Sequence, residues 1–126
     1  MTFIAEIDEK IEPIIRMIAE DRCKGIEELT ELAESGDRSA IVFLGLYLSE
    51  KKETTDMAMK WLLLADGFGN PDAAWNIAMI ARENSNFEEM KRWIDRASDL
   101  GEEDAKIVKE NGYEVDSLLS SRSQLE

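Results

Sequence analysis

Histidine is absent from this chain of 126 residues, and several kinds of active site are excluded with it. A Ser-His-Asp triad or a Cys-His pair needs an imidazole as its base, and the usual zinc sites combine imidazole with thiolate or carboxylate ligands. Cysteine is nearly absent too, because Cys23 is the only one, so no disulfide can form within the chain. We therefore expect no catalytic, cofactor or metal site, and a protein that is not an enzyme.

Long apolar stretches are also missing. No stretch approaches the roughly 20 residues that a membrane-spanning helix requires. The first residues, 1–7, are followed by Asp8 and Glu9 rather than by the apolar core of a signal peptide. Together with the single cysteine, these features predict a protein of the reducing cytoplasm.

Basic residues are scarce, with 15 lysines and arginines against 28 acidic residues and a formal net charge of −13. The first 36 residues hold ten acidic and four basic side chains, and residues 102–126 hold seven and three, so the excess is concentrated at the two ends. Such a field repels phosphate backbones and anionic lipid, so we expect no direct binding of nucleic acid or membrane and favour a basic protein as partner. The simpler alternative is that the acidity only keeps a small protein in solution.

Glycines are few, but three of the seven recur at a regular interval. Gly36, Gly69 and Gly101 stand 33 and 32 residues apart, and each is followed four positions later by an alanine. Trp61 and Trp93 each precede the next of these glycines by eight positions. A period in the low thirties with two helical patterns per copy predicts stacked helix pairs. We therefore expect an all-α fold, an α/α superhelical solenoid of about three helix-pair repeats.

The expected organisation is a single helical-repeat domain over residues 1–126. It is divided into N-terminal helices (1–35), two repeats (36–68 and 69–100), a C-terminal capping helix (101–119) and a tail (120–126). Apolar spacing predicts helices over 2–11, 12–21 and 24–35, the first two separated at Pro13. Later helix starts are predicted from residues that cap helices well: Asp37 or Ser39, Thr54 or Thr55, Asn70 with Pro71, and Asn86.

Apolar residues at helical spacing predict the face that each repeat buries. In the second helix of the second repeat this face is expected to consist of Phe87, Met90, Trp93, Ile94 and Ala97. After Gly101 the pattern fades, as the water-facing end of a repeat array requires.

Two sets of residues resemble the Sel-like repeat, a short α/α solenoid family related to tetratricopeptide repeats. They are Ala40, Leu44, Gly45, Trp61, Ala65 and Gly69, and then Ala73, Ile77, Ala78, Trp93, Ala97 and Gly101. The resemblance implies a helical scaffold that binds other proteins. It does not imply a particular partner.

One side of each repeat's first helix is left over once the packed side is assigned, and it is predicted to line the concave surface. Its residues are Phe43, Leu46, Glu50, Asn76, Met79, Glu83 and Val108. An exposed apolar strip with acidic residues at its rim indicates a groove for a peptide or a helix. The alternative is that Phe43 and Leu46 are buried against residues 2–35.

Carboxylates also gather on the predicted helix over 24–35, on the face formed by Glu27, Glu28, Glu31 and Glu34. Such a face is often only a solvated surface, but with the N-terminal acidic excess it would steer a basic partner during association. A second acidic group, Glu102 to Asp104, lies at a predicted helix start. There we expect it to cap the helix rather than to form a site.

These features favour a non-enzymatic protein-binding module, monomeric before it binds. The most specific hypothesis is an immunity or antitoxin-type protein that occludes a basic, nuclease-like toxin, with carboxylates in place of the phosphates that the toxin binds. The alternative is a general Sel-like repeat adaptor or regulatory scaffold that binds a peptide or helix in its concave groove. An enzyme is a third hypothesis, with only carboxylates available for chemistry.

Overall fold

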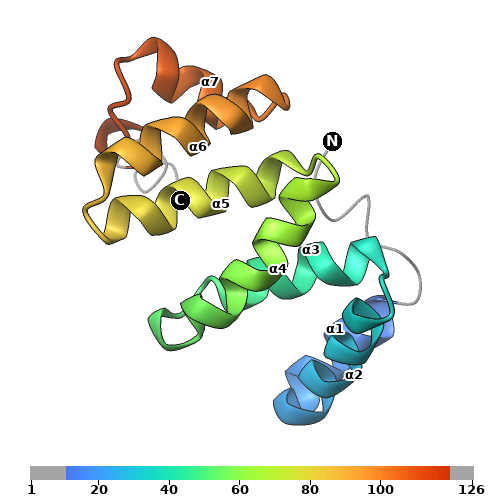
Figure 1. Ribbon diagram of the computed structural model, residues 1–126. Helices are drawn as coiled ribbons and strands as arrows, with labels where there is room; N and C mark the ends of the chain where they lie inside the picture. Colours follow the sequence, from blue (N-terminus) through green and yellow to red (C-terminus); the bar gives the residue numbers. More distant parts are fainter. Residues whose placement is uncertain (1–10, 120–126) are drawn as a thin grey trace. The chain divides into compact units, whose positions relative to one another are not determined.

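The computed structural model describes residues 11–119, and within that range the chain forms helices and turns without any strand. The helices are α1 (Glu12–Glu20), α2 (Arg22–Glu34), α3 (Arg38–Leu48), the short 3₁₀-helix η2 (Lys52–Thr54), α4 (Thr55–Gly67), α5 (Pro71–Glu83), α6 (Phe87–Asp99) and α7 (Glu103–Glu110) (Figure 1). A further helical segment begins at Asp116. The predicted all-α class is confirmed. The helix predicted over 2–11, except for its last residue, and the tail over 120–126 lie outside the described residues.

The chain folds as two compact units, the first ending at Ala65 and the second beginning at Asp66. In the first unit, α1 packs against α2 and α2 against α3. In the second unit, α5 packs against α6 and α6 against α7. The division falls in the last turn of α4, close to the boundary that the sequence predicts between its two repeats.

Three of the helices, α3, α5 and α7, share both their cap geometry and the residue before the cap. The N-cap side chain accepts a hydrogen bond from the backbone N–H three residues later, Asp37 from Ala40 at 2.9 Å, Asn70 from Ala73 at 2.9 Å and Glu102 from Ala105 at 2.8 Å. The residue before each cap is a glycine with a positive φ, 94° at Gly36, 87° at Gly69 and 98° at Gly101. A residue with a Cβ is disfavoured in this conformation. The glycine period of the sequence is therefore a repeated signal that ends one segment and starts the next helix.

The helix start predicted at Thr54 or Thr55 agrees with the observed start of α4 at Thr55, but the hydrogen bonds there differ from those of a cap. Thr54 and Thr55 were expected as caps that accept hydrogen bonds, but their hydroxyl groups donate to backbone carbonyls, that of Thr54 to Leu48 at 2.6 Å and that of Thr55 to Lys51 at 3.1 Å. The segment between α3 and α4 contains η2, which leads directly into α4. These hydrogen bonds hold the turn after α3 close to the end of that helix.

Each unit has an apolar core. The first unit buries residues that include Ile14, Leu29, Ala40, Leu44, Ala58, Trp61 and Leu62. The core of the second unit consists of Ala74, Ala78, Met90, Ile94, Ala97, Ala105, Val108 and Val115, with Trp93 partly buried against it. The repeated alanines of the sequence pattern are therefore core residues.

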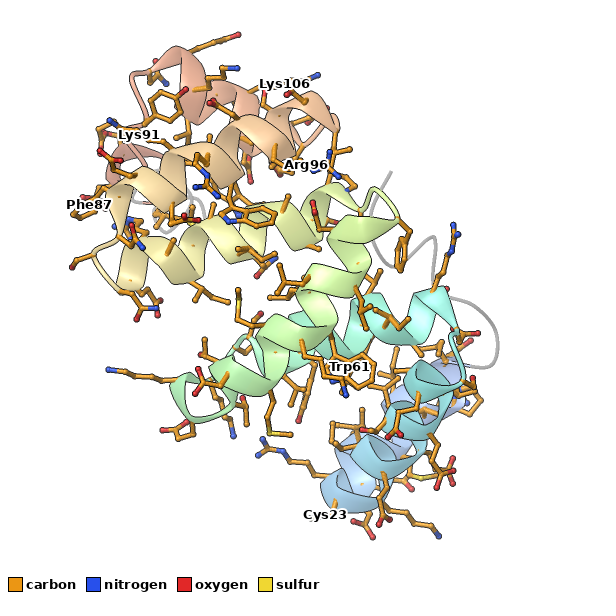
Figure 2. All side chains as sticks on the ribbon, in the orientation of Figure 1. Cys23, Trp61, Phe87, Lys91, Arg96 and Lys106 are labelled. Carbon is orange, nitrogen blue, oxygen red and sulfur yellow. The ribbon has the colours of Figure 1, made fainter. Side chains whose placement is uncertain are left out.

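Phe87 is an exception to the predicted buried face, because 54% of its surface is exposed. It is the first residue of α6, directly after the cap Asn86. Side chains on a helix lean toward its N-terminus, so a residue in the first position extends beyond the turns that pack against α5. Figure 2 shows Phe87 at the N-terminal end of α6.

The segment after α7 covers the α6–α7 pair. Val115 is buried in the core of the second unit, and Tyr113 packs partly against it. The Tyr113 hydroxyl donates to Asp95 of α6 at 2.6 Å, and Lys109 lies 3.5 Å from the same carboxylate. The Tyr113 hydrogen bond fixes the segment to α6, and the Lys109 contact joins α7 to α6.

Candidate functional site

A pocket of about 690 Å³ opens in the first unit, and we call it the α2 groove. Its apolar lining consists of Ile26, Tyr47, Leu48 and Met57. Its polar lining consists of Arg22, Cys23, Glu27, Thr30, Glu31, Glu34 and Thr54. The walls thus come from one face of α2, the end of α3, η2 and the first turn of α4.

Aromatic and apolar side chains form one part of the groove. The rings of Tyr47 and Phe43 are stacked, with centroids 6.3 Å apart and planes inclined by 11°. The guanidinium carbon of Arg22 lies 5.8 Å from the centroid of the Tyr47 ring, within the range of a cation–π contact. Met57 has 58% of its surface exposed, so the groove offers a flexible apolar side chain to an occupant.

Carboxylates form the other part of the groove. Glu27, Glu31 and Glu34 are all exposed and follow one another along α2 at intervals of four and three residues. At this spacing they lie on one side of the helix, over about 10 Å of its length. Three carboxylates therefore border an apolar surface, with Arg22 as the cationic side chain among the lining residues.

Close packing of the backbone fixes the walls. A Cβ on Gly25 would lie 2.5 Å from Ile18 Cγ1 and 2.6 Å from the Ile18 backbone nitrogen, so α2 approaches α1 at a distance that only glycine permits. A Cβ on Gly45 would lie 3.0 Å from Leu62 Cδ2, so α3 also approaches α4 closely, although less closely than α2 approaches α1. The first turn of α2 is capped by Asp21, which accepts a hydrogen bond from the Lys24 N–H at 3.3 Å. The groove is thus built on packed helices rather than on a long loop.

The four carboxylates that the sequence analysis grouped on this helix do not share one environment. Glu27, Glu31 and Glu34 line the groove, whereas Glu28 is exposed on α2 outside its lining. Glu50 is exposed just beyond α3. The acidic face therefore divides into a part that borders an apolar surface and a part that faces water.

The predicted concave strip takes its residues from both units. Phe43 and Leu46 of α3 are half-buried in the first unit. In the second unit Met79 packs partly against the core, Glu83 is exposed, and the Asn76 side-chain amide donates to the Asp72 carbonyl at 2.9 Å.

Val108 does not belong to an exposed strip, and this prediction is wrong. Its side chain is fully buried in the core of the second unit, as is Ala105 three residues before it. Residues three apart on a helix share a face, so the face of α7 that packs against α6 carries both side chains.

Tyr47, Met57 and Ile26 line the groove although the sequence does not predict them as site residues. A signal was present in the spacing of Arg22, Ile26 and Thr30, which follow one another every four residues beside the row of carboxylates. This spacing shows that they share a face of α2, but it does not show which helix lies opposite. Cys23 is exposed and also lines the groove, at the first turn of α2 (Figure 2).

No family model, no curated protein and no solved structure matches the chain. Within residues 11–119 no helix is long and apolar enough to cross a membrane. The same range contains no group of three or more acidic or cysteine side chains placed to hold a metal ion.

Proposed function

We propose that the chain is a non-enzymatic binding module of the cytoplasm, which binds a basic protein in the α2 groove. The observation that carries the proposal is the placement of Glu27, Glu31 and Glu34 beside the apolar surface of Tyr47 and Met57. Surfaces that join an apolar centre to a charged rim are typical of protein interfaces. Apolar contacts would supply the affinity, and the carboxylates would select a partner of opposite charge.

The net charge of −13 supports the same proposal at longer range. A strongly acidic protein accelerates its encounter with a basic partner, and the effect weakens as salt screens the charges. Dissociation depends instead on the contacts formed in the groove. The charge of the whole chain should therefore set the association rate, and the residues of the groove should set the dissociation rate.

The most specific form of this proposal is an immunity or antitoxin-type protein that occludes a basic, nuclease-like toxin. Its support is charge alone: carboxylates in the groove would take the place of nucleic-acid phosphates on the partner. Co-expression tests it directly. The partner alone should arrest growth and co-expression should restore it, whereas a harmless partner would leave only the broader proposal.

The alternative is a repeat scaffold of the Sel-like kind that acts as an adaptor. Its support is the cap geometry repeated at Asp37, Asn70 and Glu102, since repeat proteins build successive segments on the same local signals. The α/α solenoid belongs to this proposal. An adaptor would bind a peptide or a helix and need not neutralise an activity.

Two charge reversals on α2 test the role of the groove. Glu31→Lys and Glu28→Lys change the net charge equally on the same helix, but only Glu31 lines the groove. A basic partner would be isolated from lysate of the source cells and titrated against the wild type and both variants. We expect Glu31→Lys to weaken binding about tenfold or more and Glu28→Lys by less than about threefold.

Alkylation of the single thiol tests whether the partner binds in the groove. Because Cys23 lines the groove, an occupant should slow its alkylation by a maleimide. Equal weakening by both charge reversals, together with an unchanged alkylation rate, would show that the partner binds elsewhere. That result would overturn the proposal.

A further inference from the structure

Tyr47 has a position in the α2 groove that the general charge argument does not explain. Its ring is held by stacking on Phe43 and lies under the guanidinium of Arg22, at 5.8 Å from the centroid. Arg22 is exposed, and its cation–π contact is of the weak, solvated kind. The groove thus already holds a guanidinium against an aromatic ring, and that guanidinium belongs to the chain itself.

We infer that the Tyr47 ring binds an arginine of the partner and that Arg22 occupies this position while the groove is empty. The inference rests on the proposed function and names the chemistry of its partner: an amphipathic helix with arginines on the face that enters the groove. Binding displaces Arg22, whose exposed side chain then turns to solvent.

Arginine fits this position better than lysine. A guanidinium is planar, stacks on an aromatic ring and still presents N–H groups in its plane to a carboxylate. The groove offers both partners, the Tyr47 ring and the carboxylates of Glu27, Glu31 and Glu34. An ammonium group pairs with a carboxylate as a point charge and lacks the planar surface for stacking.

The row of carboxylates indicates that the occupant is helical. Glu27, Glu31 and Glu34 repeat along α2 at helical intervals, with the rise of about 1.5 Å per residue that every α-helix shares. A helix laid along α2 presents side chains at the same intervals, so arginines at i, i+4 and i+7 would face the three carboxylates. Leucines beside them would contact Met57 and Ile26, which line the groove.

Two fluorescein-labelled peptides test the inference. Both have 14 residues and form amphipathic helices of leucine with three cationic residues at i, i+4 and i+7, arginines in one peptide and lysines in the other. Dissociation constants are measured by fluorescence anisotropy with the intact protein. We expect the arginine peptide to bind about three to five times more tightly than the lysine peptide, and Tyr47→Leu to remove this preference.

Arg22→Ala is the decisive variant, and Lys24→Ala is its matched control. Each removes one positive charge from the first turn of α2, but Lys24 does not line the groove. Both changes should tighten binding slightly through net charge. Only Arg22→Ala should add a further gain of about threefold for the arginine peptide, since it removes the competing guanidinium.

The outcomes separate this inference from the proposed function. Equal gains in Arg22→Ala and Lys24→Ala, or equal affinity for the two peptides, would overturn the inference. If the peptides nevertheless bind and lose affinity in Glu31→Lys, the proposed function stands without it. If neither peptide binds, or if a scrambled peptide of the same composition binds equally well, the prediction of a helical occupant is also wrong. Circular dichroism checks that the Tyr47→Leu variant is folded. If that variant does not fold, Arg22→Ala still decides the test, because Arg22 is exposed.

Discussion

Glu102 begins α7 with a carboxylate that accepts a hydrogen bond from the Ala105 N–H at 2.8 Å. Burial raises the pKa of this carboxyl above its ordinary value of 4.5, and the neighbouring charges of Asp104 and Asp72 raise it further. Backbone hydrogen bonds from Ala105 and Asp104 act in the opposite direction but are the weaker influence. Ionisation of Glu102 therefore destabilises the folded state relative to the unfolded chain.

This pKa shift predicts a pH-dependent effect of Glu102→Asn. A raised folded pKa means that the contribution of Glu102 to stability is lost as the pH rises from about 4.5 through the folded pKa. Asparagine caps a helix without a charge. The free energy of unfolding of the variant should exceed that of the wild type at pH 7, and the excess should shrink as the pH falls to 4. Urea unfolding across this range measures it, and an excess that does not vary with pH would contradict the assignment.

Single residues were predictable where their role is local. The caps Asp37, Asn70 and Asn86 follow from a side chain and the N–H three residues later, and all three are observed. The predictions for Phe87 and Val108 were wrong, because the burial of a side chain depends on which turns of another helix pack against it. That information is absent from the spacing within one helix.

Helix pairs depend on small residues where two backbones approach. At Gly25 the space for a Cβ is filled by the backbone of Ile18, which cannot rotate away as a side chain can. At Gly45 the contacts are longer, 3.0 Å to Leu62 Cδ2 and 3.2 Å to the Leu62 backbone nitrogen, so a shift of a few tenths of an ångström would make room. The α1–α2 pair is therefore the less tolerant of the two, and α2 carries most of the groove.

Gly25→Ala should destabilise the protein by about 1–3 kcal/mol, because the added methyl group forces α1 and α2 apart. Gly67→Ala is the control, since a Cβ there has no neighbour within 4 Å and its φ is not in the left-handed region. That change should leave stability unchanged or raise it by up to about 1 kcal/mol. Urea unfolding of both variants measures the difference. Equal stability of the two would show that the α1–α2 approach is not tight in solution.

Helix positions were predictable, but the groove was not. The helices predicted over 12–21 and 24–35 agree within two residues with α1 and α2, because periodicity and caps are properties of a single segment. The groove is formed where α2 meets the end of α3 and η2. Its acidic rim was predicted in part, as Glu27, Glu31 and Glu34, whereas the ring of Tyr47 became a groove residue only once the helix pairing was known.

For the whole molecule, the repeat period and the helical spacing of apolar residues predict the all-α class, which residues 11–119 confirm. The Sel-like relation, the solenoid and the basic partner remain predictions. The chain as a whole contributes its charge of −13, which acts at distances where individual contacts do not. The association rate constant should therefore respond to salt and net charge, and the dissociation rate constant to substitutions in the groove.

Stopped-flow kinetics with the arginine peptide test this separation. Raising the salt concentration from about 50 to about 500 mM should lower the association rate constant about tenfold and change the dissociation rate constant much less. Glu28→Lys and Glu31→Lys should slow association similarly, since each changes the net charge by the same amount. Only Glu31→Lys should accelerate dissociation. A dissociation rate that rises equally in both variants would contradict a local role for the groove.

The glycine and the helix cap that recur at Gly36, Gly69 and Gly101 affect which changes in length the encoding gene can undergo. Each glycine ends one segment, and the next residue caps the helix that follows, so residues 70–101 carry both their own beginning and their own end. An in-frame duplication of this segment would join Gly101 to a second Asn70 and recreate an existing junction. A deletion or insertion of a few residues would create a junction without these signals. Variation in length should therefore arise by gain or loss of whole segments, each of which brings its own surface.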